Sequence, residues 1–242
     1  ITDWYVEELQ LDANGKPKST TFKGKDEPLQ SADETFVIAE LKSPILPSKG
    51  GTETWTRYTT FDGRWIAEIE GDKVKKDHKP GKGETVVNLG GTFVVPKDTD
   101  KDGKITAISF DYTGLDDGNM LLGLESFGRS KNVADMRESM RYLVAYSQNI
   151  AAADADGGVM YSGYQGVPCR KNLPRDANGE WLPGADPSQL LDGTKYGGFT
   201  IPIKDGKVDE TPGKTDPSKC VVPFESYPMA LNPTGRIVVT AN

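Results

Sequence analysis

A carboxamide that follows a short β-branched stretch is the first group in this sequence that could do chemistry. Residues 237–240 predict a buried strand, and this strand leads directly to Asn242. Because a strand fixes the backbone on one side of this residue, the side chain of Asn242 could act as a preorganised N–H donor. Such a donor stabilises the oxyanion that forms during acyl transfer. The alternative is that Asn242 is only a polar residue at the end of a strand.

An acidic loop at residues 98–103 is the second candidate site. Carboxylates stand at alternate positions of this loop: Asp98, Asp100 and Asp102. Gly103 follows in the sixth position of a calcium-loop pattern, and carboxylate oxygens that converge on a hard cation are what Ca²⁺ requires. The twelfth position is Ser109 instead of Glu, and the flanking segments 84–95 and 104–112 are typical of strands. A plain acidic hairpin turn between these two strands is therefore the alternative to a calcium site.

Two cysteines, Cys169 and Cys220, lie in the turn-rich last third of the chain. A disulfide between them would close a loop of about 50 residues and stabilise the protein by roughly 3–4 kcal/mol on a chain-entropy estimate. Such a bridge would suit an exported protein, and the alternative is a pair of free thiols in a cytosolic one. Neither cysteine has a histidine beside it, so the sequence does not indicate a thiol nucleophile.

Composition excludes two classes of function. The net charge of −7 argues against a nucleic-acid partner, because binding to phosphates requires clustered Lys and Arg. No run of 18 apolar residues exists that could span a membrane. The 242 residues, with 27 Gly and 16 Pro, allow one large domain or two modest ones that are rich in turns and strands.

Hydrophobic patterning predicts an α+β protein that is mostly antiparallel β with one or two helices. Apolar residues at helical spacing predict helices over 121–127 and 133–146, the second with Asn132 as its N-cap. Alternating segments joined by turn signals predict strands over 4–11, 18–23, 35–41, 52–61, 64–70, 150–154 and 159–164. We therefore expect a β-rich portion at 1–120. A helix-plus-strand portion with a long loop segment is expected at 121–242.

Two motif runs in the second half carry a resemblance to a known family. The first contains Gln148-Asn149, then Ala153-Asp154-Ala155-Asp156-Gly157, then Gly166-Val167-Pro168. The second contains Pro223-Phe224, Asn232-Pro233 and Gly235, and it ends at Asn242. In this order and spacing they resemble the penicillin acylase family of N-terminal-nucleophile hydrolases. The first 120 residues match the family more loosely, mainly at residues 2–7.

The resemblance implies a layered αββα sandwich, of which this chain would form part. It also implies hydrolysis of an amide or lactam side chain through an acyl-enzyme. The nucleophile would be a serine that autoproteolysis frees at the start of the large subunit, with its own α-amino group as the base. Asn242 corresponds by motif position to an oxyanion donor of the family. The family often binds one calcium ion, for which the Asp3 carboxylate and the Thr2 carbonyl would be ligands.

Because the sequence begins at Ile1, we expect the nucleophilic serine to lie upstream, and this chain to be an internal piece of the large (β) subunit. Its partners would be the small subunit, the rest of the large subunit and an acylated amide such as a β-lactam or an acyl-homoserine lactone. The expected location is periplasmic or secreted. The competing hypothesis is a non-catalytic, calcium-binding, β-rich surface module, which the loop at residues 98–103 motivates.

Overall fold

A computed structural model describes residues 1–116, 118–146, 148–235 and 237–239. The chain forms two compact units, which we describe separately. The strand unit comprises residues 3–111 and 175–198, and the helix unit comprises residues 1–2, 112–174 and 199 onward. The division into domains at residue 120 stays a prediction.

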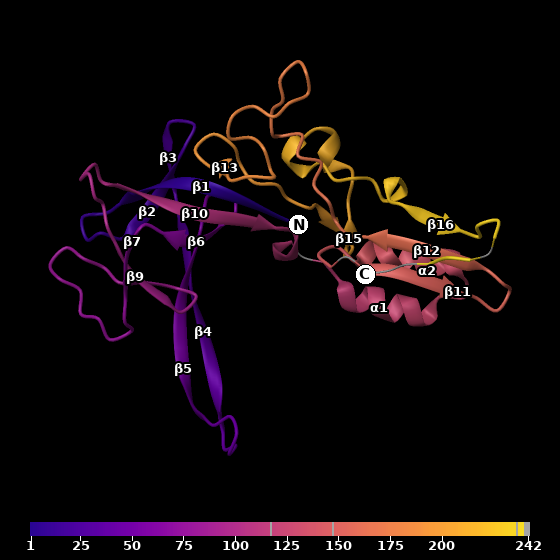
Figure 1. The fold of residues 1–242 in the computed structure, drawn as a ribbon, viewed down its shortest axis with the longest axis horizontal. Coiled ribbons are helices and arrows are strands. Elements are labelled where there is room, and N and C mark those ends of the chain that lie inside the picture. Colours follow the sequence, from indigo (N-terminus) through magenta and orange to yellow (C-terminus); the bar gives the residue numbers. More distant parts are fainter. Residues whose placement is uncertain (117, 147, 236, 240–242) are drawn as a thin grey trace. The chain divides into compact units, whose positions relative to one another are not determined.

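An eight-stranded sheet forms most of the strand unit, with the order β3-β2-β1-β10-β6-β5-β4 and with β13 parallel to β1 (Figure 1). Its strands are β1 (Thr2–Leu11), β2 (Pro17–Phe22), β3 (Lys25–Pro28), β4 (Gln30–Leu41), β5 (Ser48–Thr59), β6 (Trp65–Ile69), β10 (Lys104–Tyr112) and β13 (Leu191–Asp192). Strand periodicity places Tyr5, Glu7 and Leu9 of β1 on one buried face. The apolar core lies on this sheet and includes Leu9, Tyr58, Ile66, Ile69 and Ile105.

A second, three-stranded sheet of the strand unit corrects one expectation from the sequence. It has the order β7 (Gly71–Val74), β9 (Thr92–Pro96) and β8 (Val87–Leu89). The segment 84–95 was expected to be one strand, but it folds back on itself at Gly90 and Gly91, both of which have positive φ. Because β9 and β10 belong to different sheets, the acidic loop at residues 98–103 connects two sheets, and the alternative of a plain hairpin turn between paired strands is wrong.

The helix unit has a three-stranded sheet of order β11 (Gln148–Ala153), β12 (Val159–Tyr164) and β16 (Met229–Leu231). Its helices are α1 (Met120–Arg129) and α2 (Val133–Ser139), and 3₁₀ turns form at η1 (Thr113–Leu115) and η2 (Met140–Tyr142). The expected hairpin of β11 and β12 is confirmed in register from Gln148↔Tyr164 to Ala153↔Val159. Together with the antiparallel pairing in the strand unit, this confirms the α+β class.

The helix expected over 133–146 is too long. Asn132 caps α2 as predicted, by accepting a hydrogen bond from the Asp135 N–H at 2.8 Å. The α-helix ends at Ser139 and is followed by one 3₁₀ turn, after which the Val144 carbonyl accepts a hydrogen bond from the Gly166 N–H. The predicted apolar face is nevertheless buried, since Met140, Leu143 and Val144 are each at most 2% exposed.

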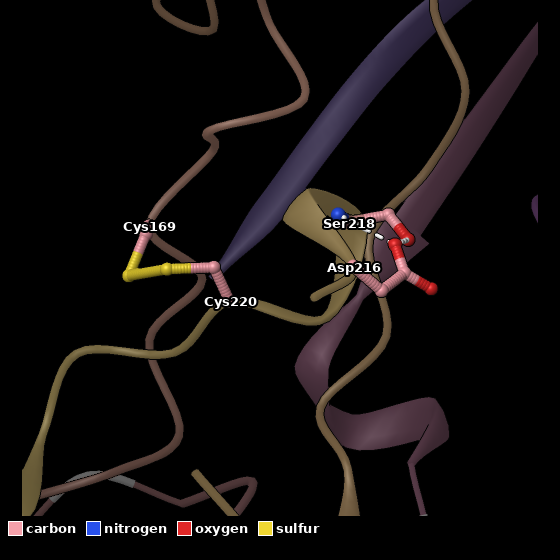
Figure 2. Close-up of a disulfide and its surroundings, with 4 residues drawn as sticks. All are labelled: Cys169, Asp216, Ser218 and Cys220. Atoms are coloured by element: carbon pink, nitrogen blue, oxygen red, sulfur yellow. Dashed lines mark hydrogen bonds between the residues drawn. A yellow bond between two sulfur atoms is a disulfide. The ribbon is translucent and has the colours of Figure 1, made fainter. Parts of the chain in front are cut away.

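Between β12 and β16 the chain forms only short elements: β13, β14 (Ile203–Lys204), β15 (Lys207–Val208), η3 (Pro212–Lys214), η4 (Pro217–Lys219) and η5 (Phe224–Ser226). A disulfide joins Cys169 to Cys220, as the sequence favoured, with 5.3 Å between their Cα atoms (Figure 2). The Asp216 carboxylate caps η4 by accepting hydrogen bonds from the N–H and hydroxyl of Ser218, and this turn leads into Cys220. The Cys169 N–H also donates to the Cys220 carbonyl at 2.8 Å, so a backbone hydrogen bond and the disulfide join the same two residues.

The buried strand expected over 237–240 is not present at residues 237–239. Ile237 is 74% exposed and Val239 is 85% exposed. A buried strand requires a neighbouring strand, and among the described residues none pairs with this segment. Thr240 lies outside the described residues. In the described ranges, no helix has the length and apolar character needed to cross a membrane.

Replacing both Cys169 and Cys220 with Ser should lower the free energy of unfolding by about 4 kcal/mol, because the bridge closes a loop across a separation of 51 residues. Urea unfolding of the oxidised protein and of the double variant measures this difference. The reduced wild type should match the double variant, and equal midpoints for the oxidised wild type and the variant would contradict the prediction.

Candidate functional site

Asn242, the predicted oxyanion donor, lies outside the described residues. The structure does show what the rest of its motif run does. Asn232 clamps β16 to β12, because its Oδ1 accepts from the Val159 N–H at 2.9 Å and its own N–H donates to the Val159 carbonyl at 2.8 Å. Asn232 has a φ of +49°, a conformation that Asn tolerates better than most residues. This motif asparagine is therefore a structural clamp between the two runs.

Asp154 of the first run connects a turn to a helix. Its carboxylate accepts hydrogen bonds from the N–H groups of Gly158, at 2.6 Å, and Val133, at 3.2 Å. These two donors, Gly158 first, hold the pKa of Asp154 below its ordinary value. A Cβ at position 158 would lie 2.3 Å from Asp154 Oδ2, so a side chain there would displace this carboxylate from its hydrogen bonds. Asp154 and Asp156 could be considered as an acid–base pair, but these contacts assign Asp154 a turn and helix-capping role.

Phe224 of the second run is fixed against α2 and η2. Its side chain is 1% exposed, and the guanidinium groups of Arg137 and Arg141 lie 4.1 and 3.8 Å from the centre of its ring. Both arginines also form ion pairs with Glu225, at 3.0 and 2.9 Å. Tyr164 of β12 meets the Phe224 ring edge-on at 4.8 Å. Both motif runs thus belong to one packed structure, built from β11, β12, β16 and α2.

The three aspartates of the acidic loop come together as predicted. One carboxylate oxygen from each of Asp98, Asp100 and Asp102 lies within 4.8 Å of the others. The Asp98 carboxylate also accepts hydrogen bonds from the N–H groups of Lys101, at 2.6 Å, and Gly103, at 2.7 Å, which shapes the loop. The loop borders a cavity of about 570 Å³ whose lining includes Glu8, Glu70 and Asp192. Lys104 pairs with Glu8 and Lys195 pairs with Asp192, both at 2.7 Å, so part of the acidic lining is already compensated by cations.

Titration in the loop reflects this crowding. The hydrogen bond to Asp98 and the charge of Asp102 raise the pKa of Asp100 above its ordinary value. Desolvation by itself would raise the pKa of the Asp98 carboxyl, but hydrogen bonds from the N–H groups of Gly103 and Lys101 lower it. Ser109, the twelfth position of the calcium-loop pattern, is fully buried on β10, where its hydroxyl donates to Glu7.

Thr2 and Asp3 occupy a different place from the acidic loop. They begin β1, and Asp3 is 1% exposed while Thr2 is exposed. Burial raises the pKa of the neighbouring Tyr5, and the charges of Asp3 and Asp111 raise it further. Among the described residues, Asp3 does not belong to the group of three carboxylates in the acidic loop. The structure therefore separates the predicted metal ligands into two sets.

A buried ion-pair network was missed by the sequence analysis. Arg64 and Glu7 have fully buried side chains, and Arg64 Nη1 lies 2.7 Å from Glu7 Oε1. Arg64 Nε donates to Asp62 Oδ1 at 3.0 Å, and Thr20 donates to Glu7 Oε2 at 3.2 Å. One feature of the sequence could have predicted this network: the alternation in β1 that buries Tyr5 and Leu9 also places the charged Glu7 on the buried face.

Comparison with known proteins was made for the whole chain. The sequence profile of the family described as penicillin amidase matches residues 1–242.

The chain belongs to the penicillin amidase family.

A solved structure of similar fold is "Thermostable Penicillin G acylase from Alcaligenes faecalis in orthorhombic form", with a TM-score of 0.53 and 16% sequence identity. The similarity covers 100% of this chain and 30% of that one, so the chain spans less than a third of the length of this solved penicillin G acylase. Comparison with curated proteins gives no match.

Replacing Arg64 with Met should lower the free energy of unfolding by about 3–5 kcal/mol, because it leaves the buried charge of Glu7 without its partner. Arg57→Met is the matched control. Arg57 pairs with Glu34 at 2.9 Å, but both side chains are a third or more exposed, so its loss should cost at most about 1 kcal/mol. Chemical denaturation measures both values, and similar losses for the two variants would contradict the assigned role of Arg64.

Proposed function

We propose that this chain is part of a penicillin-acylase-type enzyme that hydrolyses an amide-linked acyl side chain through a serine acyl-enzyme. The observation that carries this proposal is the family match over residues 1–242. The packing of the two motif runs into one sheet-and-helix structure supports it, because Asn232, Asp154 and Phe224 each make specific contacts there. Substrates would be penicillins, cephalosporins, acyl-homoserine lactones or related amides.

The reaction requires a nucleophile, a base and an oxyanion donor. The serine Oγ would attack the amide carbonyl while its α-amino group takes the proton, and the amine product would leave as the acyl-enzyme forms. Water would then release the acid in the same way. The carboxamide of Asn242 would donate a hydrogen bond to the carbonyl oxygen as negative charge develops on it. Only this last role is proposed for a residue of this chain.

The remaining parts would come from polypeptide outside this sequence. The chain spans 30% of the solved acylase it resembles, which supports its role as one piece of a larger subunit. The parent enzyme would comprise a small subunit and the rest of the large subunit. The disulfide between Cys169 and Cys220 supports a periplasmic or secreted location, since such bonds persist in oxidising compartments.

Calcium is the proposed cofactor, and the two sets of predicted ligands fit it differently. Asp98, Asp100 and Asp102 supply three carboxylates whose oxygens already lie close together. Ca²⁺ takes six to eight oxygen ligands, so the adjoining acidic cavity or water would complete such a site. At β1, the Asp3 carboxylate and the Thr2 carbonyl supply two ligands. Bound calcium would stabilise the loop by neutralising its negative charge.

A second candidate function is a non-catalytic calcium-binding surface module. The Asp98 loop specifically favours this alternative, because its three carboxylates lie close enough to hold a cation without another subunit. The two hypotheses differ in what they predict for the protein that carries this sequence. An acylase hydrolyses amides with or without this loop occupied, whereas a module binds calcium and hydrolyses nothing.

Asn242→Ala in the parent enzyme should lower kcat by ~10²–10³-fold without changing the thermal midpoint, as expected for the loss of one oxyanion donor. Asn232→Ala is the matched comparison. It should lower the thermal midpoint because it breaks the clamp to Val159, while folded enzyme keeps most of its kcat.

Release of the amine from a panel of phenylacetyl and fatty-acyl anilides measures activity. Normal turnover in a well-folded Asn242 variant would remove this residue from the mechanism. A folded parent that hydrolyses none of the panel would favour the module.

Asp100→Asn should weaken calcium binding to the acidic loop by about tenfold or more, because it removes one anionic ligand but leaves the Asp98 hydrogen bonds that shape the loop. Isothermal titration with calcium measures the affinity. Asp176→Asn, in a similar exposed turn, is the control, and Asp3→Asn separates the site at β1 from the loop. Equal affinities for wild type and Asp100→Asn would show that the loop is a plain acidic connection.

A further inference from the structure

The outer part of the hairpin of β4 and β5 forms an arm with its own exposed tip. The two strands pair in one register from Gln30↔Thr59 to Leu41↔Ser48. The next strand of the sheet, β6, pairs with β5 only at Thr59↔Trp65, so the outer part is a two-stranded ribbon. Figure 1 shows β4 and β5 as a long ribbon whose far end lies away from the other strands of the unit. We call residues 42–49, at this far end, the arm tip.

The arm tip presents two large aliphatic side chains to solvent. Ile45 is 84% exposed and Leu46 is 73% exposed. Single exposed apolar residues are common, but these two are adjacent and stand between Pro44 and Pro47, which restrict the backbone. A rigid tip loses little conformational entropy when it inserts into another phase.

The backbone of the tip is prepared for an apolar environment. The Ser43 hydroxyl oxygen accepts hydrogen bonds from the N–H groups of Ile45 and Leu46, both at 3.2 Å. An N–H group that enters the edge of a lipid layer without a partner costs free energy, because water is no longer available to accept its hydrogen bond. Ser43 therefore satisfies the two donors that would enter first.

The charge of the tip differs from that of the whole chain. The net charge is −7, but Lys42 and Lys49 are the only charged residues between positions 41 and 52. Both lysines are exposed, and they flank the aliphatic pair on either side. An aliphatic wedge between two cations is complementary to the interface of an anionic lipid layer, where acyl chains lie beneath phosphate groups.

We propose that the arm tip docks on an anionic lipid surface, with Ile45 and Leu46 in the headgroup–acyl boundary and Lys42 and Lys49 against lipid phosphates. The enzyme thereby associates peripherally with a membrane through one loop. Apolar surface continues along the arm at Val37 and Leu41, which are 82% and 53% exposed. We favour a lipid surface because the two lysines beside the aliphatic pair complement lipid phosphates, and a protein partner that covers the arm is the alternative outcome of the vesicle test. The proposal is independent of the acylase function, since none of these residues has a role in the proposed chemistry.

Co-sedimentation with vesicles tests the proposal in the protein that carries this sequence. The probes are vesicles of phosphatidylcholine alone and vesicles that also contain phosphatidylglycerol. Wild type should bind the anionic vesicles, and Ile45→Asp combined with Leu46→Asp should reduce partitioning by roughly tenfold or more, as expected when two aliphatic side chains no longer insert. Leu121→Asp is the matched control, because Leu121 is 76% exposed but lies on α1.

The lysines are tested separately. Lys42→Gln combined with Lys49→Gln should reduce partitioning to anionic vesicles by roughly tenfold, and added salt should have the same effect on wild type. Lys79→Gln combined with Lys82→Gln, in another exposed loop, is the control and should bind like wild type. Thermal midpoints and turnover in detergent-free solution should be the same for all variants, which separates this test from that of the proposed function.

Three results would overturn the proposal: no sedimentation of wild type with anionic vesicles, equal partitioning of the Ile45 and Leu46 double variant, or equal loss in the Leu121 control. A lower thermal midpoint for the tip variant would also overturn it, because it would show that another part of the protein covers the tip.

Discussion

The strand unit depends on one buried cation. The Arg64 guanidinium lies between Glu7 of β1 and Asp62 of the turn before β6, at 2.7 and 3.0 Å, and its Cζ atom lies 4.6 Å from the centre of the Tyr5 ring. Its Nη1 also donates to the Tyr196 carbonyl at 3.4 Å, which attaches the segment 175–198 to the sheet. A charge removed from water is tolerated only when partners replace its hydration. Each of these partners must therefore keep its position if the buried charge of Arg64 is to stay compensated.

This requirement extends to residues with no charge. Glu7 also accepts hydrogen bonds from Thr20 of β2 and Ser109 of β10, so strands on both sides of β1 contribute to one carboxylate. A Cβ at Gly193 would lie 2.5 Å from Glu7 Oε2, so only glycine fits the backbone that passes this group. The network thus allows fewer arrangements of the strands than the apolar core alone would, since apolar contacts have no preferred direction.

The helix unit uses charges differently. Arg137 and Arg141 lie against the face of Phe224 and pair with Glu225, whose side chain is 64% exposed. Here the Phe224 ring and Arg137 are both buried, while Arg141 and Glu225 are more exposed. Many of the family's motif residues therefore maintain the structure: Asn232 clamps two strands, Asp154 links a turn to a helix, and Phe224 anchors the segment that continues toward Asn242. The residues that carry the sequence resemblance are therefore also residues that hold the helix unit together.

Local patterns in the sequence determined much of this protein. Strand alternation, turn signals and the Asn132 cap predicted the α+β class, the hairpin of β11 and β12 and the start of α2, because these depend on interactions between near neighbours in the chain. The spacing of Asp98, Asp100 and Asp102 likewise brought their carboxylates together within one loop. The two motif runs also indicated the family.

Tertiary structure decided the features that depend on distant partners. Arg64 meets Glu7 across 57 residues, and no local pattern encodes such a pair. Helix α2 ends at Ser139, and beyond it the Val144 carbonyl pairs with the distant Gly166 N–H. The segment at 237–239 remains exposed where its β-branched composition predicted a buried strand. The acidic loop joins two sheets instead of closing a hairpin, because β10 pairs with β6. Local preference is therefore realised only where the folded chain supplies a partner, because burial and hydrogen bonding depend on contacts between distant residues.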